Sequence, residues 1–262
     1  MREAKTWVFG DTHGAYKALI QVFERAGIQE GDTIISLGDI CDGWSQVYEC
    51  VELLVSMQYK YNMIFIKGNH DEWFNTFIQT GINPVNWAQG GIGTLMSYCR
   101  NLDKEYVHTD KNYLSTLLES DIPESHRNFF HRQLKWYKDE NLNLFIHGGF
   151  NRHYPLSEHH DQHVFWWDRD LWYAALSYGN MQQHDVTKLG SFKIKEPVNR
   201  IYIGHTATTS WKTNKPMEAA NITNLDTGAG FKGKLTIMDV ATRKYFQSDP
   251  VEHLYDEKGR NG

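Results

Sequence analysis

Three short polar turns recur in the first 71 residues, and each turn follows an apolar run. The turns read Gly10-Asp11-Thr12-His13-Gly14, Gly38-Asp39-Ile40-Cys41-Asp42 and Gly68-Asn69-His70-Asp71. Their spacing of about 30 residues is the length that a strand, a helix and a second strand need in one βαβ unit. The sequence therefore predicts two consecutive units of this kind, with the three turns side by side on one edge of a sheet.

The apolar runs before the turns have the composition of buried strands. They span residues 6–9, 33–37 and 63–66 and are rich in β-branched and aromatic side chains, as is typical of strands covered on both faces. Between them, apolar residues recur at steps of three and four and predict helices over about 14–26 and 44–58. Open α/β sheets bind ligands at the carboxyl ends of parallel strands, so a site is expected where the turns meet.

Two further apolar runs each end in a histidine beside glycine. Residues 144–146 lead into His147-Gly148-Gly149, and residues 201–203 lead into Gly204-His205-Thr206. Glycine lets the backbone approach a ligand closely, and imidazole and oxygen donors together suit manganese, iron, zinc or magnesium. The sequence therefore predicts a divalent-metal site, with the single carboxylate of Asp39 as the natural bridge between two ions.

In this order the five motifs resemble those of the calcineurin-like metallophosphoesterases, over about residues 5–240. His147-Gly148-Gly149 and the later Asp226-Thr227-Gly228-Ala229 are similar to the serine/threonine phosphoprotein phosphatase branch, which includes bacterial and phage enzymes. Ala207 agrees with that branch, because it stands where other branches carry one more histidine. The resemblance implies an α/β metallophosphoesterase fold: two packed mixed β-sheets flanked by helices, with a mostly helical insert.

The resemblance also implies a site for two divalent ions, with manganese as the first choice and iron, zinc or magnesium as alternatives. The implied metal ligands are Asp11, His13 and Asp39 for one ion and Asp39, Asn69, His147 and His205 for the other. His70 matches the residue that protonates the leaving oxygen, and Asp42 matches the carboxylate that orients it. A histidine paired with a carboxylate keeps one tautomer, which suits a general acid near neutral pH. Asp42 could instead cap the following helix.

The phosphate-binding residues are less complete than in the resembled branch. There the second motif continues as D-R-G, and its arginine binds phosphate, whereas this chain has Asp42-Gly43-Trp44. Arg169 matches a second phosphate-binding arginine of the family, with Asn69 as a further phosphate ligand. Arg152 is a weaker candidate for the missing contact. Arginine suits this task because its planar fork of donors fits phosphate oxygens.

Together these features predict hydrolysis of phosphate monoesters by a hydroxide that two metal ions activate, as in serine/threonine protein phosphatases. Because the D-R-G arginine is missing, two enzymatic alternatives stay open: a symmetrical dinucleoside tetraphosphate hydrolase, or a nucleotide or nucleic-acid phosphodiesterase. A metal-free scaffold of the same fold is the non-enzymatic alternative. The intact ligand positions and His70 argue against it.

Composition limits the partners. The chain has 262 residues with 27 basic and 32 acidic side chains, a formal charge of -5, which argues against broad binding to nucleic acid. A phosphorylated substrate, either a phosphoprotein or a nucleotide, is the expected partner. No apolar stretch has the length of a membrane span, and three cysteines without a C-x-x-C pair favour a reducing cytoplasm.

The rest of the chain is expected to complete one domain over residues 1–250. Residues 71–143 predict a mostly helical insert or lid, with amphipathic segments at 110–120 and 123–139. Residues 151–195 form a long connection without a clear period, in which we expect Trp166, Trp167 and Trp172 to pack and the histidines to be solvated. Strands are predicted at 200–203, 221–225, 234–240 and 243–247, followed by a loose polar tail over 251–262.

Overall fold

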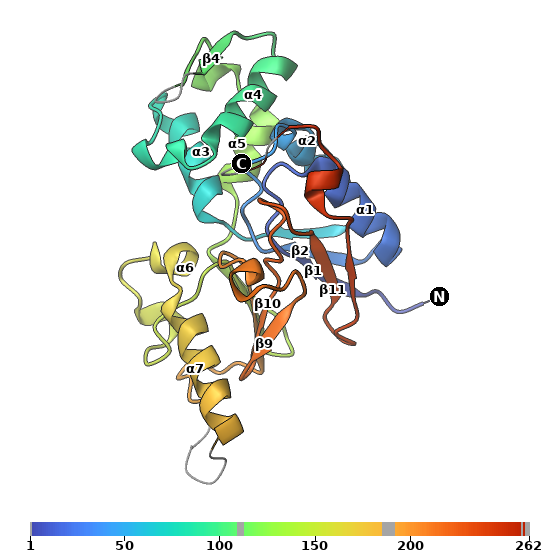
Figure 1. Ribbon diagram of the computed structural model, residues 1–262, viewed down its shortest axis with the longest axis vertical. Helices are drawn as coiled ribbons and strands as arrows, with labels where there is room; N and C mark the ends of the chain where they lie inside the picture. The colour runs from blue at the N-terminus through green and yellow to red at the C-terminus, as the bar shows by residue number, and fades with distance from the viewer. Residues whose placement is uncertain (1, 109–112, 185–191, 258, 260–262) are drawn as a thin grey trace.

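The computed structural model describes residues 2–108, 113–184, 192–257 and 259. Two five-stranded mixed sheets lie at the centre and helices flank them, which confirms the predicted α/β class (Figure 1). Among the described residues, no helix is both long enough and apolar enough to cross a membrane.

The first sheet carries the three predicted strand ends. Its parallel strands are β1 (Thr6–Phe9), β2 (Thr33–Ser36) and β3 (Asn62–Phe65). β11 (Thr236–Asp239) pairs antiparallel with β1, and β12 (Tyr245–Gln247) pairs antiparallel with β11. Helices α1 (Tyr16–Ala26) and α2 (Val47–Met57) connect the parallel strands. The two predicted βαβ units are therefore confirmed, although each helix begins later than predicted.

The second sheet has the strand order β6-β7-β8-β10-β9. β7 (Asn143–Ile146), β8 (Arg200–Ile203) and β10 (Ile222–Asn224) run parallel, while β6 (Trp136–Lys138) and β9 (Met217–Ala219) form antiparallel edges. The facing sides of the two sheets share a buried apolar layer, in which the rings of Phe145 and Tyr202 stack 5.0 Å apart. Because burial of apolar surface stabilises this contact, the layer fixes both sets of strand ends relative to each other.

The insert between β3 and β7 is mostly helical, as predicted. It contains α3 (Asn69–Thr80), η1 (Val85–Ala88), α4 (Gly91–Asn101), η2 (Glu119–Asp121) and α5 (Glu124–His131), and it lies at the top of Figure 1. Two of the expectations inside it are wrong. The segment 110–120 contains strand β5 (Tyr113–Ser115), which pairs with β4 (Tyr106–His108), and its residues 110–112 lie outside the described ranges. The segment 123–139 is helical only as far as His131, because β6 pairs with the edge of the second sheet.

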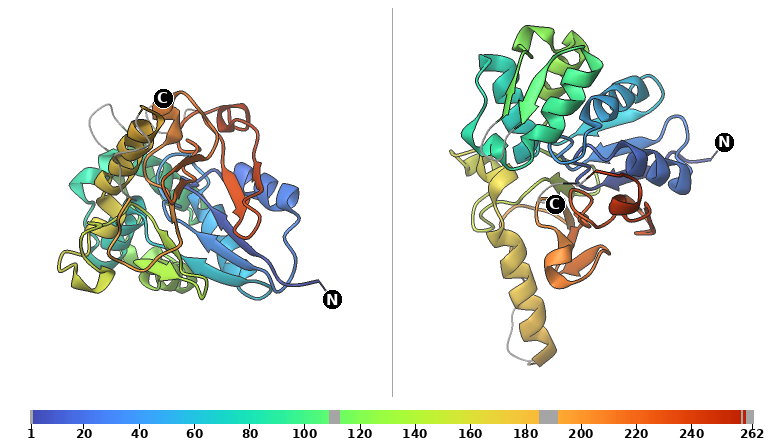
Figure 2. Two further views of the ribbon diagram at one scale, coloured as in Figure 1. Left: turned by 90° about the horizontal axis from the view of Figure 1, so that it is seen from below. Right: turned by 45° about the horizontal axis from the view of Figure 1, so that its top comes forward.

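The long connection between β7 and β8 contains helices that the sequence analysis did not predict. A short turn, η3 (Leu156–Glu158), precedes α6 (Val164–Trp167) and α7 (Asp170–His184). α7 extends away from the sheets, at the opposite end of the molecule from the insert, in Figure 1 and in the right-hand view of Figure 2. Its apolar side chains lack a clear helical period, so an analysis of amphipathic pattern does not detect it.

The C-terminal tail is packed, not loose, as far as Glu257. Val251, in η5 (Val251–His253), is buried, and the Tyr255 ring stacks on Trp44 with centroids 4.8 Å apart. The Glu257 carboxylate accepts hydrogen bonds from the backbone N–H and the hydroxyl of Ser45. The expectation of a loose tail is therefore wrong for residues 251–257, because a few specific contacts anchor a sequence that is polar on average.

A buried carboxylate ties the start of the chain to the first sheet. Asp32 accepts hydrogen bonds from the backbone N–H groups of Lys5 and Gln29, from the Trp7 indole and from the Arg2 guanidinium. Burial alone would raise the pKa of Asp32, but these donors hold the pKa below its usual value. The resulting stabilisation is complete above about pH 5, where Asp32 is also ionised in the unfolded chain. It is lost as the pH falls through the pKa of the folded state.

Asp32→Asn is expected to lower the free energy of unfolding by about 2 kcal/mol at neutral pH, because an amide NH2 then faces these donors. The difference from the unchanged protein should shrink as the pH falls from about 5 to about 3. Urea unfolding across this range measures the difference. A difference that stays constant would show that the carboxylate charge is not what stabilises this contact.

Candidate active site

The turns after β1, β2 and β8 interlock through hydrogen bonds. The backbone N–H of His13 donates to the Asp39 carbonyl at 2.8 Å, and the N–H of His205 donates to the Asp11 carboxylate at 3.0 Å. His13, Asp39, Asp42 and His205 all have positive φ angles, between 49° and 66°. Residues with side chains rarely adopt this conformation, and those that do gather at functional sites. The turns therefore converge at one edge of the sheets.

Asp39 lies at the centre of the cluster and belongs to two groups of possible metal ligands. One group contains His13, Asp39 and His70, the other contains Asp39, His147 and His205, and in each the ligand atoms lie within 4.8 Å of one another. Asp39 Oδ2 is 3.6 Å from His13 Nε2 and 3.4 Å from His147 Nε2. Asn69 Oδ1 is 3.3 Å from the same His147 nitrogen. The structure thus brings five of the six predicted ligands together around one carboxylate.

Asp11, the sixth predicted ligand, lies against the turn after β8. Its Oδ2 accepts the backbone N–H of His205, while its Oδ1 is buried with no hydrogen-bond partner among the described residues. Gly204 permits this close approach, because a side chain there would lie 2.1 Å from Oδ1. The glycine that the sequence places beside His205 is therefore required by the packing of the site.

The hydrogen bonds of the histidines fit metal binding. Nδ1 of His13 and of His147 each lie within 2.9 Å of backbone carbonyl oxygens, so in the neutral rings these nitrogens carry the proton and donate it. Nε2, the atom on the side of Asp39, then offers its lone pair to a cation. In addition, Asp11 Oδ1 and His205 Nε2 are buried without hydrogen-bond partners among the described residues, which is costly unless an ion binds them. The residues present therefore fit divalent cations.

The charged groups of the cluster compete for protons. Burial would raise the pKa of Asp39, yet the neighbouring His147 holds this pKa well below its usual range. Burial would lower the pKa of His147, but the carboxylates of Asp39 and Asp11 raise it to about 9. Burial and the charge of Asp226 raise the pKa of Asp11, while burial and the charge of His147 lower the pKa of His205. Because a bound cation replaces such shared protons, metal binding should release protons.

His70 and Asp42 form a buried pair beside this cluster. His70 Nδ1 lies 2.8 Å from Asp42 Oδ2, and His70 Nε2 is buried with no hydrogen-bond partner in the described part of the chain. The alternative expectation for Asp42, capping of the following helix, is wrong, because α2 begins at Val47 after Gln46 with no side-chain cap. The structure thus places the two side chains in contact, and their catalytic role stays a prediction.

Two residues of the insert complete this pair and were not predicted. The Trp87 indole N–H and the Thr94 hydroxyl donate to Asp42 Oδ1 at 2.8 and 2.6 Å. They lie 45 and 52 residues after Asp42 in the chain, in a segment that carries no motif, so no local pattern could identify them. Only the packing of the insert onto the second turn brings them there.

Gly43 and Trp44 form a packed turn where the resembled branch carries its arginine. Gly43 has φ 129°, and a side chain there would lie 3.0 Å from the His13 carbonyl oxygen. Trp44 is buried, and its indole N–H donates to the Ala229 carbonyl at 2.8 Å. The turn therefore packs the second motif against the segment that contains Ala229 and supplies no cationic side chain.

The two candidate phosphate-binding arginines have different surroundings. Arg169 Nη1 donates to the His205 carbonyl at 3.0 Å and to the Thr206 hydroxyl at 3.2 Å, which places the guanidinium beside a predicted metal ligand. Arg152 instead donates to the Lys193 carbonyl at 2.8 Å. The structure therefore brings Arg169 to the cluster and engages Arg152 elsewhere.

Of the three tryptophans that we expected to pack, two lie in the core and one lies at the surface. Two of them are buried in the core of the second sheet, Trp166 and Trp172. Trp167 is 39% exposed, and its ring centroid lies 5.9 Å from that of His205 and 5.6 Å from that of Trp73. The Trp73 ring, on α3, lies 4.4 Å from His70. Trp73 and Trp167 together form an aromatic wall beside the site histidines.

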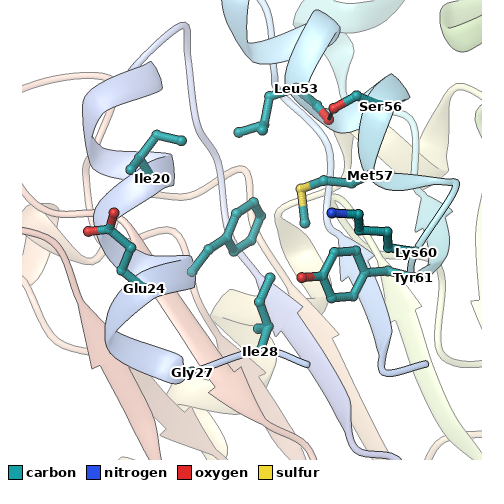
Figure 3. A pocket seen from close by; sticks show the side chains of 10 residues that line it. Ile20, Glu24, Gly27, Ile28, Leu53, Ser56, Met57, Lys60 and Tyr61 are labelled. Carbon is teal, nitrogen blue, oxygen red and sulfur yellow. Dashed lines mark hydrogen bonds between the residues drawn. The ribbon is translucent and has the colours of Figure 1, made fainter. Parts of the chain in front are cut away.

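A separate pocket lies between α1 and α2 (Figure 3). Ile20, Leu53 and Met57 line it together with Lys60 and Tyr61. It borders the segments that precede β2 and β3, at the opposite strand ends from the polar turns. None of the predicted site residues lines it, so this pocket is not part of the candidate site.

Comparison with known proteins identifies a matching family model and shared folds. The model of the calcineurin-like phosphoesterases matches residues 4–208. The solved structure of a candidate diadenosine tetraphosphatase is 12% identical with a TM-score of 0.60, over 99% of this chain and 95% of that chain. A protein serine/threonine phosphatase from Saccharomyces cerevisiae is 14% identical with a TM-score of 0.56, over 99% and 84%. A metallophosphoesterase from Sphaerobacter thermophilus is 15% identical with a TM-score of 0.52, over 95% and 89%. At these identities the likeness to solved structures shows the fold alone.

Proposed function

The chain belongs to the calcineurin-like phosphoesterases and is a metal-dependent phosphoester hydrolase, and we propose that it acts on phosphate monoesters, as serine/threonine protein phosphatases do. The observation that carries the proposal is the Asp39 carboxylate, which two groups of possible ligands share; one of these groups contains His70, which is paired with the buried Asp42. A phosphate monoester is doubly charged, and the group that leaves when its P–O bond breaks is an alkoxide or phenoxide. Its hydrolysis therefore needs both strong charge neutralisation and an acid.

The proposed ligands of two divalent ions are the six predicted residues. One ion would be held by Asp11, His13 and Asp39, and the other by Asp39, Asn69, His147 and His205. Manganese is the first choice because carboxylate, amide and imidazole donors favour hard or borderline ions. When bound, such ions lower the pKa of a water molecule and neutralise phosphate oxygens.

The protein's own side chains bind the phosphate and move the proton. Arg169, anchored at the His205 carbonyl, and Asn69 are proposed to bind phosphate oxygens. His70 donates its Nδ1–H to Asp42, which leaves Nε2 to carry the proton for the leaving oxygen. Asp42 holds the ring in an orientation that keeps Nδ1 directed at the carboxylate.

The proposal predicts a preference among model substrates. With manganese present, the kcat/KM for p-nitrophenyl phosphate should exceed that for bis(p-nitrophenyl) phosphate and that for diadenosine tetraphosphate. Steady-state rates with the three substrates measure this, and removal of metal by EDTA followed by manganese addition controls for metal dependence. A preference for the diester would replace the monoester proposal, and protein that takes up no metal would favour the scaffold alternative.

A second candidate, hydrolysis of dinucleoside polyphosphates, is favoured by the aromatic wall. Trp167 is partly exposed next to His205, and Trp73 lies next to His70. Stacking of a nucleobase on an aromatic side chain contributes about 1–3 kcal/mol, so the wall could hold the base of a nucleotide leaving group. A higher kcat/KM for diadenosine tetraphosphate than for p-nitrophenyl phosphate would support this candidate over the first.

Arg169→Ala is expected to raise the KM for p-nitrophenyl phosphate by about tenfold or more, because a hydrogen bond to a charged group contributes about 1.5–3 kcal/mol. Arg169→Lys should show an intermediate KM, since an ammonium keeps the charge but loses the planar fork. Arg152→Ala is the matched control and should leave KM unchanged. A KM that does not change in Arg169→Ala would refute the assignment of this arginine to phosphate.

The cellular setting is a further proposal. The cysteines at 41, 50 and 99 are buried free thiols, as expected in a reducing cytoplasm. The proposed partner is a phosphorylated substrate, either a phosphoprotein or a nucleotide.

A further inference from the structure

Asp42 is held from two sides, and one of these sides belongs to the insert. Its Oδ2 faces His70 Nδ1 at 2.8 Å, while its Oδ1 accepts hydrogen bonds from Trp87 and Thr94. All four side chains are buried. Because water does not compete at this depth, each of these hydrogen bonds constrains the carboxylate strongly.

Thr94, on α4, contacts Asp42 twice. Its hydroxyl oxygen accepts the Asp42 backbone N–H at 2.9 Å, and its hydroxyl proton is donated to Asp42 Oδ1 at 2.6 Å. Asp42 has φ 66°, a conformation that is costly for a residue with a side chain. A partner that binds both the backbone and the carboxylate therefore stabilises a conformation that Asp42 would otherwise leave.

Trp87, in η1, restricts the same carboxylate oxygen. An indole N–H can only donate, so its bond uses Oδ1 as the acceptor and leaves Oδ2 for His70. The Trp87 ring also packs against Phe77 with centroids 5.4 Å apart, and a side chain at Gly91 would lie 2.2 Å from the ring. η1 and the start of α4 are thereby held together as they approach Asp42.

We propose that Trp87 and Thr94 are positioning residues for proton transfer, which hold Asp42 and through it hold the His70 ring with Nε2 directed at the leaving oxygen. The insert is then part of the catalytic apparatus and more than a wall or lid. This inference rests on the proposed function, in which His70 is the acid. A positioned acid contributes about 10²–10⁴-fold to turnover, so a loosened acid should lose part of that factor.

Variants of Thr94 separate positioning from packing. Thr94→Val keeps the shape of the side chain and removes the hydroxyl. Thr94→Ser keeps the hydroxyl and should therefore keep the kcat of the unchanged protein. Ser97→Ala is the matched control on the same helix, because the buried Ser97 hydroxyl donates to Glu49 and not to Asp42. Trp87→Phe removes the indole N–H and so tests the second hydrogen-bond donor to Asp42 Oδ1.

The kinetic arm compares p-nitrophenyl phosphate with phenyl phosphate in the presence of manganese. Phenyl phosphate has the poorer leaving group and depends more on the acid. Thr94→Val is expected to lower kcat for phenyl phosphate about tenfold, with a smaller loss for p-nitrophenyl phosphate and an unchanged KM. Trp87→Phe should follow the same pattern, and Thr94→Ser and Ser97→Ala should behave like the unchanged protein.

The spectroscopic arm needs neither metal nor turnover. In spectra of the metal-free protein labelled with 15N-histidine, the Nδ1 proton of His70 is identified by its absence in His70→Asn. We expect a sharp, slowly exchanging signal in the unchanged protein, in Thr94→Ser and in Ser97→Ala. Thr94→Val should broaden this signal or make it exchange faster.

The two arms also separate failure of the inference from failure of the proposed function. Equal kinetic losses for both substrates, with an unchanged His70 signal, would overturn the inference and leave Trp87 and Thr94 as packing residues. If His70→Asn lowers kcat equally for phenyl phosphate and p-nitrophenyl phosphate, the acid role fails. The spectroscopic arm then still decides whether Thr94 positions the ring. If Thr94→Val does not fold, Thr94→Ala and Trp87→Phe carry the same two readouts.

Discussion

Asp39→Asn is expected to remove both metal ions and to lower turnover by at least about a thousandfold. Asp39 belongs to both ligand groups and lies within 3.6 Å of the Nε2 atoms of His13 and His147. Without its charge, both groups lose the carboxylate that they share. Metal ions of this kind contribute several kcal/mol to catalysis, and each 1.36 kcal/mol corresponds to a factor of ten in rate.

The asparagine substitution leaves the turn itself intact. Asp39 has φ 52°, a conformation that Asn adopts more readily than most residues. The side-chain carbonyl of Asn can still accept the backbone N–H of His70, which Asp39 Oδ1 now accepts at 3.0 Å. Loss of metal and activity would therefore not reflect a collapsed loop.

Two measurements check this expectation. Elemental analysis after dialysis gives the metal content, and turnover of p-nitrophenyl phosphate at saturating manganese gives the activity. Asp32→Asn is the control, because Asp32 is a buried carboxylate bonded to Trp7 and not to any site residue. This control should keep its metal and its kcat. An Asp39→Asn protein that still binds two ions per chain would refute the shared-ligand proposal.

His70→Asn is expected to lower kcat by about 10²–10⁴-fold without changing the metal content, because the proton donor is lost and the proposed ligands remain. The loss should be greater for phenyl phosphate than for p-nitrophenyl phosphate. His70 Nε2 is buried beside the cluster without a hydrogen-bond partner among the described residues, as a donor awaiting a substrate atom would be.

A different role for His70 is also measurable. His70 lies in one of the two ligand groups, with His13 and Asp39. If it binds metal, His70→Asn should lose an ion together with its activity, whereas loss of an acid leaves both ions in place. His163→Asn is the matched control, because this exposed ring bonds Asp161 and none of the proposed site residues, and the change should not affect kcat. Unchanged turnover in His70→Asn would end the acid proposal.

Local sequence pattern predicted the frame of the site well. The strands before Asp11, Asp39 and Asn69 are short and apolar, and the helices between them have a clear period. Such patterns indicate strands and amphipathic helices from the chain alone, and the structure forms these elements. The strands before His147 and His205 follow the same rule in the second sheet.

Predictions from the sequence pattern were wrong where contacts between distant segments decide the structure. α7 has no clear amphipathic period, and β6 became a strand because the edge of β7 offered backbone partners. The tail was expected to be loose from its polar composition, yet Tyr255 and Glu257 hold it against Trp44 and Ser45. A single ring or carboxylate changes the composition of a segment very little, so composition does not predict these contacts.

The sequence by itself determined the strand-and-turn frame, the six candidate metal ligands and the position of His70, because each of these residues stands in a polar turn that follows a short apolar strand. Only the tertiary structure decided which arginine reaches the cluster and how Asp42 is held. Trp87 and Thr94 meet Asp42 from a distant insert without any motif or period. Their hydrogen bonds exist because packing brings the insert onto the second turn, and packing of distant segments leaves no local mark in the chain.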